Sequence, residues 1–352
     1  MKRLVCVDAR LIAASGIGTF LKSALTALAE EANCELILLC KENEIERLKK
    51  FSSRLVVMQS AIYTCKEQIE YFTKIPRCDL FWAPHFNIPL LPVRAQKRLT
   101  TICDVYHLVN FQALSLSQKI YAKLLYNAAF FLSDTIMTIS EFSKNEILKY
   151  ATWRPKKIEI VSPSLDFNSL EGVATRDFIL CVGNLKPHKN LVRLVKAYAQ
   201  LQPKEPLYIV GRKEGLVTLD NQLFQEVEKN PFLQHNVHFM GYVSEEKLKE
   251  LYKRAVLLIF PSLYEGFGYP PLEAMACGCP VVASQVSAIP EVCGAAVEYI
   301  DPYSIHSIAE GMQRLLNDQE RREELIQKGR EHVEKKSRQT NRIVEVIHAC
   351  CR

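Results

Sequence analysis

Short, continuous apolar runs alternate along the chain with longer segments in which apolar residues recur at helical spacing. Such runs are typical of parallel strands buried on both faces, and the amphipathic segments between them are typical of crossover helices. In the first half we expect strands at Leu4–Val7, Leu36–Cys40, Leu55–Met58, Leu80–Ala83, Leu99–Cys103, Thr135–Ile139 and Ile158–Val161. The helices expected between them include Phe20–Glu30, Ser117–Leu132 and Glu141–Tyr150.

The same alternation restarts after Pro163–Arg176, a segment of proline, glycine and polar residues that we interpret as an interdomain linker. The second half carries expected strands at Phe178–Val182, Leu207–Val210, Val237–Met240, Ala255–Phe260, Pro280–Ala283 and Ala296–Ile300. The last expected helices are Ile305–Leu316, Glu320–Lys335 and Gln339–Cys350. This rhythm predicts an α/β fold with two Rossmann-like, doubly wound domains at 1–165 and 177–335, followed by a terminal helix within 336–352. Their ligands are expected in a central cleft, at the carboxyl ends of the strands.

Composition narrows the class of protein. The chain has 352 residues, of which 48% are hydrophobic and 24% charged, so it is long enough for two cores and unlike a disordered chain. A net charge of +6 suits anionic small molecules or a membrane surface, and no nucleic-acid-binding motif accompanies it. No apolar run is long enough for a membrane span or a signal peptide. We therefore expect a cytoplasmic protein whose twelve cysteines are reduced.

The most informative stretch is Phe260–Pro280, which reads FPSLYEGFGYPPLEAMACGCP. Gly266 and Gly268 let the backbone approach a ligand closely, and the two prolines that follow are suited to opening a helix. The N-terminal end of that helix would favour an anion such as a phosphate. Glu265 lies in the loop, and Glu273 falls about one turn into the helix, where its carboxylate could accept two hydrogen bonds from a ribose diol.

The two glutamates, separated by seven residues within the text EGFG…P.LEAMA.G.PV, closely resemble the signature of glycosyltransferase family 4. The resemblance implies a retaining sugar transferase with the GT-B fold and a last helix that crosses back onto the first domain. It also implies that Glu273 holds the ribose of a nucleotide sugar. The amides of Gly266, Phe267 and Gly268 would hold its diphosphate, and Glu265 would contact the sugar or stabilise an oxocarbenium-like transition state.

Two further loops join an expected strand to an expected helix. The first, ASGIGTF at Ala14–Phe20, resembles the family's N-terminal glycine loop, which implies that Gly16 and Gly18 approach the donor phosphates or the acceptor; a tight turn is the alternative. The second is VGNLKPHKN at Val182–Asn190. A lysine at a helix N-terminus opposes the dipole and so suggests a negative ligand beside it. Resemblance to the family's basic phosphate-binding segment implies that Lys189 contacts the diphosphate.

Many members of the family have an arginine just after the glycine of that second loop. Asn184 occupies the position in this chain, and Arg212, which follows the next expected strand, is a candidate to replace the missing cation. An ordinary surface arginine is the alternative interpretation of Arg212. We assign both residues to the donor side.

The first half contributes candidates of its own. His85 lies in the strand-end loop FWAPHFNIPL, and the resemblance implies that it contacts the transferred sugar; a structural histidine is the alternative. Asp104 and His107 lie in TICDVYHL, which resembles a family segment that often has a histidine where Cys103 stands. Asp104 and His107 would line the acceptor side or only support the loop. Ser140 we interpret as a helix N-cap.

The expected helix Ser117–Leu132 carries Lys119, Lys123 and many aromatic residues. Such a helix could touch a membrane surface or a lipid-linked acceptor, or its apolar stripe could simply belong to the core.

These observations predict a retaining glycosyltransferase that moves a hexose from a nucleoside-diphosphate sugar to a glycan or glycolipid hydroxyl, with catalytic roles for Glu265, Lys189 and His85. GDP-mannose is the leading donor, and surface-polysaccharide synthesis is the leading process. A UDP-sugar-dependent transferase, an epimerase and a non-catalytic nucleotide-sugar-binding protein are the alternatives. The chain has no D-x-D triplet, so we expect no metal cofactor, with Lys189 and helix-terminal amides balancing the charge of the leaving diphosphate.

Overall fold

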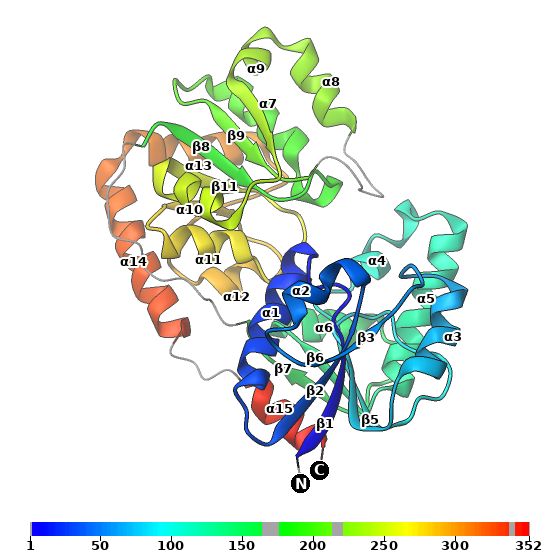
Figure 1. Cartoon of the computed structure of the whole chain (residues 1–352). Coiled ribbons are helices and arrows are strands. Elements are labelled where there is room, and N and C mark those ends of the chain that lie inside the picture. Colours follow the sequence, from blue (N-terminus) through cyan, green and yellow to red (C-terminus); the bar gives the residue numbers. More distant parts are fainter. Residues whose placement is uncertain (1, 164–175, 213–220, 338–341, 352) are drawn as a thin grey trace. The chain divides into compact units, whose positions relative to one another are not determined.

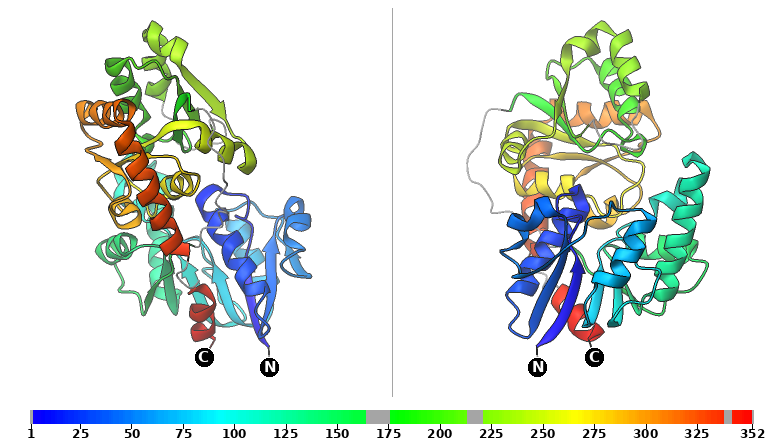
Figure 2. Two further views of the ribbon diagram at one scale, coloured as in Figure 1. Left: turned by 90° about the vertical axis from the view of Figure 1, so that its left-hand side faces the viewer. Right: turned by 45° about the vertical axis from the view of Figure 1, so that its right-hand side comes forward.

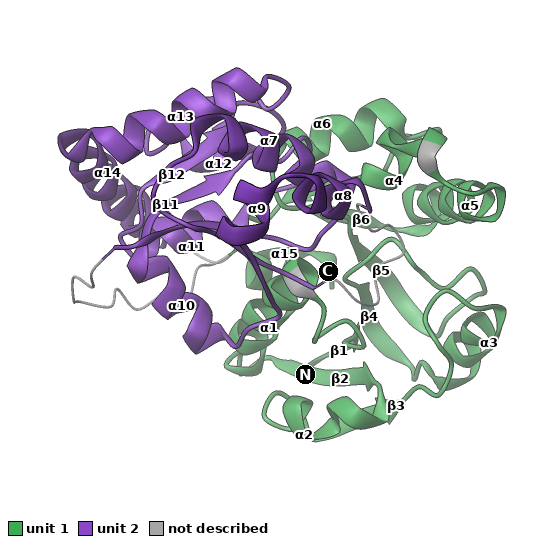
Figure 3. Ribbon diagram, turned by 90° about the horizontal axis from the view of Figure 1, so that it is seen from above, with its two compact units in different colours: residues 1–164, 340–352 green, residues 165–339 purple. Residues whose placement is uncertain are grey.

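The computed structural model describes residues 2–163, 176–212, 221–337 and 342–351 (Figure 1). The chain divides into two compact units, one of residues 1–164 and 340–352 and the other of residues 165–339, which Figure 3 colours separately. Most of the linker expected at Pro163–Arg176 lies outside the described residues. Within the described residues, no helix is both long and apolar enough to cross a lipid bilayer.

Unit 1 is built on a seven-stranded parallel sheet in the order β3-β2-β1-β4-β5-β6-β7. Its strands are β1 (Arg3–Asp8), β2 (Cys34–Cys40), β3 (Arg54–Val57), β4 (Cys78–Ala83), β5 (Ala95–Thr101), β6 (Thr135–Thr138) and β7 (Ile158–Ile160). Its α-helices are α1 (Ser15–Ala29), α2 (Ile45–Leu48), α3 (Cys65–Lys74), α4 (Tyr106–Val109), α5 (Leu116–Leu132), α6 (Glu141–Tyr150) and α15 (Ile343–Cys350).

Unit 2 is built on a six-stranded parallel sheet in the order β10-β9-β8-β11-β12-β13. Its strands are β8 (Phe178–Val182), β9 (Leu207–Val210), β10 (Val237–Gly241), β11 (Ala255–Phe260), β12 (Val281–Ser284) and β13 (Glu298–Ile300). Its α-helices are α7 (Leu191–Leu201), α8 (Asn221–Lys229), α9 (Pro231–Asn236), α10 (Glu245–Arg254), α11 (Tyr269–Ala276), α12 (Ile289–Cys293), α13 (Ile305–Asn317) and α14 (Gln319–Ser337).

Every strand expected from the sequence is present; the central strands are mostly buried, whereas the edge strands β3, β7 and β10 are largely exposed or partly exposed. All six residues of β11 are buried, for example, as are the first four of β8. The largest error is in β5, which was expected at Leu99–Cys103 and runs from Ala95 to Thr101. Three of the four residues before Leu99 are polar, and all four are exposed or partly exposed, so they extend the ladder without adding to the apolar run. Hydrophobic pattern therefore located the strands but not all their ends.

The first glycine segment is not a loop, which corrects the sequence interpretation. Helix α1 begins at Ser15, so Gly16 and Gly18 lie in its first turn. A Cβ atom at position 18 would lie 2.6 Å from the carbonyl oxygen of Ile12, because the chain between β1 and α1 folds tightly over this turn. Local packing therefore accounts for Gly18, and the proposed contact of Gly16 and Gly18 with a ligand stays a prediction.

The C-terminal helix α15 belongs to unit 1 rather than to the unit that precedes it in sequence (Figures 1 and 2). It packs against α1 and β5, and its Ile343 and Ile347 are fully buried. The guanidinium of Arg3 donates a hydrogen bond of 2.7 Å to the carbonyl oxygen of His348. The chain thus returns at its end to the first sheet.

Both sheets have one point at which the order of strands reverses, and the site candidates lie there. In unit 1 the reversal falls between β1 and β4, and in unit 2 between β8 and β11. Crossover connections leave to opposite faces at such a point, so the carboxyl ends of the two central strands border a crevice. His85 follows β4, Lys189 follows β8, and Glu265 follows β11.

Candidate active site

The structure brings Lys189 and Glu265 together. The Lys189 Nζ lies 2.5 Å from Glu265 Oε1, and each side chain is only 15% exposed. Lys189 Nζ also lies over the Phe260 ring, 5.3 Å from its centre, in a cation–π contact. A cation and a carboxylate from two different loops are therefore paired at the end of the central strands of unit 2.

Asn190 holds the lysine loop against the glutamate loop. It is buried, adopts a left-handed backbone conformation (φ 61°), and begins α7 directly after the short 3₁₀ turn Pro187–Lys189. Its Nδ2 donates to the carbonyl oxygens of Pro261 at 3.0 Å and Pro302 at 2.7 Å. Sequence reasoning did not single out Asn190. An asparagine directly after the lysine is a usable signal, since asparagine is among the few residues that adopt this conformation readily.

Gly183 makes room for the lysine side chain. It follows β8 with φ +155°, and a Cβ atom placed there would lie 3.3 Å from both Cδ and Cε of Lys189. Its carbonyl oxygen is in turn approached so closely by Gly211, at the end of β9, that a Cβ on Gly211 would lie 2.0 Å away. Gly183 therefore leaves room for the Lys189 side chain beside the end of β8, and Gly211 lets the backbone at the end of β9 approach Gly183 closely.

The glutamate loop ends in the helix predicted for it. Gly268 precedes α11 with φ +115°, a conformation that L-residues rarely adopt. Because Pro270 and Pro271 lack an N–H group, the amides that can face a ligand at this end belong mainly to the loop before the helix. Phe267 is buried at 4% exposure, so only its backbone suits the predicted diphosphate contact. The amide of Glu265 itself donates to Ser287 Oγ at 3.1 Å, which fixes the loop.

Glu273 lies in α11, one turn past the start of the helix as predicted, and is partly exposed. The hydroxyl of Tyr252, on α10, donates to Glu273 Oε2 at 2.8 Å. Burial of the carboxyl raises the pKa of Glu273, and the Tyr252 hydroxyl opposes that rise by donating to the charged form. One carboxylate oxygen is thus oriented by a protein donor. Tyr252 was not identified from the sequence, since it lies in an ordinary amphipathic helix.

Asn184 and Arg212 lie side by side at the ends of β8 and β9. The backbone N–H of Arg212 donates to Asn184 Oδ1 at 3.2 Å. The guanidinium of Arg212 lies 4.8 Å from the centre of the Tyr242 ring, a side chain that is 69% exposed at the end of β10. Arg212 is therefore at the correct edge of the sheet to serve as a second cation, and this role stays a prediction.

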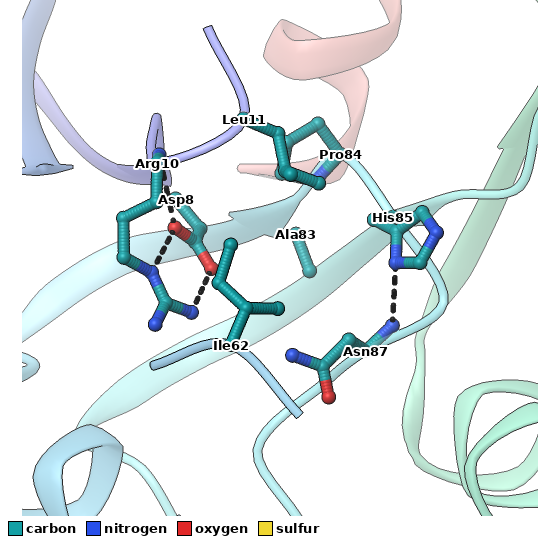
Figure 4. A pocket seen from close by; sticks show the side chains of 8 residues that line it. All are labelled: Asp8, Arg10, Leu11, Ile62, Ala83, Pro84, His85 and Asn87. Atoms are coloured by element: carbon teal, nitrogen blue, oxygen red, sulfur yellow. Dashed lines mark hydrogen bonds and ion pairs between the residues drawn. The ribbon is translucent and has the colours of Figure 1, made fainter. Parts of the chain in front are cut away.

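His85 is the candidate catalytic residue of unit 1. It lines a small pocket at the point between β1 and β4 where the strand order reverses (Figure 4). Its Nδ1 accepts from the amide of Asn87 at 3.4 Å and lies 3.5 Å from the hydroxyl of Tyr63. Its ring stacks obliquely on Phe86, with 4.0 Å between ring centres. Burial, with a smaller contribution from the nearby charge of His107, lowers the pKa of His85 to about 3. His85 is therefore neutral near neutral pH.

A buried ionic network forms part of the wall of this pocket, and sequence reasoning missed most of it. Arg10 Nε and Nη2 donate to the two carboxylate oxygens of Asp8 at 2.8 and 2.7 Å, and Nη2 lies 2.6 Å from Glu67 Oε1. The hydroxyl of Tyr71 donates to Asp8 at 2.6 Å. Glu67 in turn accepts from Asn87 Nδ2 at 2.9 and 3.0 Å.

This network links β1, α3 and the His85 loop. Arg10 is 2% exposed and is paired with two carboxylates, so its positive charge is fully compensated within the network. Glu67 is fully buried and holds Asn87, two residues beyond His85. The only sequence signal was the alternation of charges in VDAR next to a buried strand. Buried titratable groups paired beside a pocket are a common feature of functional sites.

Asp104 and His107 lie in and beside α4. Asp104 Oδ1 accepts from the amide of Tyr106 at 2.9 Å, so this carboxylate caps the start of the helix. His107 is exposed, and its ring centre lies 5.5 Å from that of Phe86. Phe86 thus lies between His85 and His107. Ser140 is the N-cap of α6, as predicted, and accepts from the amide of Ser143 at 3.0 Å.

We expect acidification to destabilise unit 1 through His85. A histidine in an unfolded chain titrates near pH 6.5, whereas His85 stays neutral down to about pH 3. Between these values the unfolded chain binds a proton that the folded chain does not, so the free energy of unfolding falls as the pH falls. The loss between pH 7 and pH 5 is at most about 2 kcal/mol.

Denaturant unfolding of the wild type and His85→Gln at both pH values measures this effect. The variant should lose less stability on acidification than the wild type does. Equal losses, or a His85 ring that titrates near 6.5 by NMR, would contradict the assignment.

Comparison with known proteins identifies the family. The family model of glycosyl transferases group 1 matches residues 165–332. An O-antigen chain mannosyltransferase B of Escherichia coli is 31% identical over 272 residues, which are 69% of this chain and 67% of that protein. The chain belongs to this family, glycosyltransferase family 4, and is a glycosyltransferase of the retaining class with the GT-B fold.

Two further proteins illustrate the range of the similarity. The O-antigen chain mannosyltransferase RfbU of Salmonella typhimurium is 28% identical over 296 residues, 79% of this chain and 80% of that protein. The crystal structure of Anabaena HepE in complex with UDP-glucose matches with a TM-score of 0.79 and 16% identity, covering 99% of this chain and 100% of that one. The second similarity shows the fold alone.

Proposed function

We propose that this chain transfers mannose from GDP-mannose, with retention, to a hydroxyl of a glycan or lipid-linked glycan during surface-polysaccharide synthesis. The similarity to two O-antigen chain mannosyltransferases supports the sugar and the process. The observation that carries the site is the Lys189–Glu265 pair at the reversal of the second sheet. The bond between C1 of the sugar and a diphosphate oxygen breaks, the acceptor oxygen bonds to C1 on the same face, and the proton of the acceptor hydroxyl passes to the leaving diphosphate.

Different residues of unit 2 would bind different parts of the donor. The ribose diol would bind Glu273, and the diphosphate would lie against Lys189 and the loop amides of Gly266, Phe267 and Gly268, with Arg212 beside them. In the free protein Glu265 neutralises Lys189, so an arriving diphosphate competes for the ammonium group and leaves Glu265 to contact the sugar. Charge that builds on the leaving diphosphate is then stabilised by groups already in position, with no metal ion required.

His85 would meet the transferred sugar from unit 1 as a neutral imidazole. With Nδ1 occupied by the Asn87 amide, Nε2 is the nitrogen left to face a ligand. Because the ring is uncharged, it can orient a sugar hydroxyl without adding charge near the reacting carbon. Asp104 and His107 would lie on the acceptor side.

A thermal-shift and calorimetric screen of GDP, UDP, ADP and their sugars, with and without EDTA, tests the proposal. GDP and GDP-mannose at a hundredfold excess over their Kd should stabilise the protein by about 2.7 kcal/mol, a rise in Tm of several degrees, whether or not EDTA is present. A selective response to a UDP-sugar would replace the mannose assignment, and a response that EDTA abolishes would contradict metal independence. No response to any nucleotide, together with no turnover, would favour a non-catalytic protein.

A further inference from the structure

The outward face of α5 is apolar. Leu116, Ile120, Leu124 and Phe131 are 75%, 62%, 54% and 60% exposed, and they recur at helical spacing along the 17 residues of the helix. Figures 1 and 3 show α5 at the margin of unit 1. Single exposed apolar residues are ordinary, but four large ones that recur as a stripe on one helix face indicate an interaction surface.

The core of unit 1 does not account for this stripe, because the opposite face of α5 already serves the core. Ala122, Leu125, Tyr126, Ala129 and Phe130 are all buried on that inner side. A surface helix normally pairs one apolar face with one polar face. The outer face of α5 instead exposes large apolar side chains among polar ones, and the core of unit 1 does not use them.

The polar residues around the stripe are cationic. Helix α5 contains Lys119 and Lys123 and no acidic residue. In the described part of the chain neither lysine forms an ion pair, and Lys119 Nζ lies 5.7 Å from the centre of the Phe111 ring. Trp153, which is 58% exposed, packs on Phe131 with 5.8 Å between ring centres, and Arg154 follows it. Aliphatic side chains, a tryptophan and unpaired cations are the combination that binds an anionic bilayer surface.

A hollow beside the stripe is large enough for a lipid headgroup. Its volume is about 250 Å³, and Lys123, Tyr126 and Asn127 of α5 line it together with Phe111 and Tyr150. Its single charged side chain is Lys123, so an anionic group is the electrostatically favoured occupant.

We propose that α5 docks unit 1 on an anionic lipid bilayer. Leu116, Ile120, Leu124 and Phe131 enter the interface, with Trp153 at the headgroup level. Lys119, Lys123 and Arg154 contact lipid phosphates, and the hollow beside Lys123 receives one headgroup.

The inner face of the same helix supports the candidate site. The hydroxyl of Tyr121 donates to Asn87 Oδ1 at 2.8 Å, and Tyr126 stacks on Phe86 with 4.2 Å between ring centres. The His85 loop therefore rests on the helix that faces the membrane. If the acceptor is lipid-linked, as the proposed function holds, docking on α5 brings its glycan to the side of unit 1 that carries His85.

Vesicle flotation of the full chain, without nucleotide sugar, tests the docking. Wild-type protein should bind vesicles of phosphatidylcholine and phosphatidylglycerol at least tenfold more tightly than vesicles of phosphatidylcholine alone. The double variant Ile120→Ser/Leu124→Ser should lose at least tenfold in partitioning to the anionic vesicles, and Lys119→Glu/Lys123→Glu should lose the preference for them. Phe131→Ser should weaken binding, while Tyr303→Ser in unit 2, whose side chain is equally exposed at 60%, should not.

Three results would overturn the proposal. One is vesicle binding by Ile120→Ser/Leu124→Ser equal to that of the wild type, with both proteins folded by thermal unfolding. Another is no vesicle binding by the wild type. The third is that the wild type does not bind vesicles but forms a dimer by light scattering, and that Ile120→Ser is a monomer. A second copy of the chain would then cover this face of α5. Donor binding and turnover on a water-soluble acceptor should survive in Ile120→Ser/Leu124→Ser, so failure of docking is separable from failure of the proposed function.

Discussion

Replacing Lys189 by alanine is expected to lower turnover by about 10²–10³-fold, the effect of removing one preorganised donor from a transition state. The leaving diphosphate gains negative charge as the sugar bond breaks. The Lys189 side chain is 15% exposed, lies against Gly183, and is followed by the buried Asn190 that anchors its loop, so only its pairing with Glu265 has to change when the diphosphate binds. Steady-state turnover with GDP-mannose and a glycan acceptor measures the loss.

Two companion variants make the Lys189 result specific. Lys189→Arg keeps the charge and should recover part of the rate, although a guanidinium does not reproduce the compact ammonium that fits beside Gly183. Lys196→Ala removes a lysine of the same unit that pairs with Glu226 at 3.3 Å and is 42% exposed. It should leave turnover within a factor of two, since exposed ion pairs contribute little. Turnover near the wild-type level in Lys189→Ala would refute its catalytic role.

Replacing Glu273 by alanine should weaken GDP binding by about 10- to 100-fold. Hydrogen bonds to a charged group contribute about 1.5–3 kcal/mol, and each 1.4 kcal/mol corresponds to a factor of ten in Kd. The carboxylate is already oriented by the Tyr252 hydroxyl at 2.8 Å, so the wild-type protein orders it before the nucleotide arrives. Calorimetric titration with GDP gives the Kd directly.

The pH dependence adds a second, independent signature for Glu273. The ionised carboxylate is acceptor-only and binds a diol more strongly than the protonated acid does, and burial raises the pKa of Glu273. As the pH is lowered, GDP affinity should therefore begin to fall at a higher pH than it would if Glu273 had the pKa of an ordinary glutamate. Tyr252→Phe removes a donor to the charged form, so it should raise this pKa further and shift the fall to higher pH.

A control on the neighbouring helix separates ribose binding from general disturbance. Glu250 lies on α10, is 49% exposed and pairs with Lys247 at 2.9 Å. Glu250→Ala should bind GDP as the wild type does. Unchanged affinity in Glu273→Ala, with an unchanged Tm, would mean that the ribose is bound elsewhere.

The candidate donor site could be foreseen because its residues are close in sequence to the strands that place them. Glu265 lies five residues beyond the end of β11 and Lys189 lies in the loop after β8, so a strand–loop–helix pattern located both. The error at α1 has the opposite cause. Gly16 and Gly18 suggested a loop. They lie instead in the first turn of α1, where the preceding residues pack so closely that a side chain at position 18 would clash with them.

The network behind His85 could not be foreseen, because it joins residues that are far apart in sequence. Arg10 and Glu67 are 57 positions apart, and Tyr121 and Asn87 are 34 apart. None of these residues departs from what an ordinary helix or loop would carry. For a similar reason the sequence left open whether the apolar residues of α5 belong to the core or to a membrane-facing surface. An apolar residue gives the same sequence pattern in a core and on a surface. Only the burial of Ala122 and Tyr126 in the core of unit 1 shows which face of α5 remains outside.

The sequence by itself determined the two parallel sheets, the family and the pair of glutamates, because buried strands and ligand-binding turns are specified by residues within a few positions of one another. The tertiary structure decided which of these groups meet. It paired Lys189 with Glu265 and Glu273 with Tyr252, and it buried the charges of Asp8 and Glu67 against Arg10. Such contacts depend on strand order and on helix packing, which bring distant positions together and which no local pattern records.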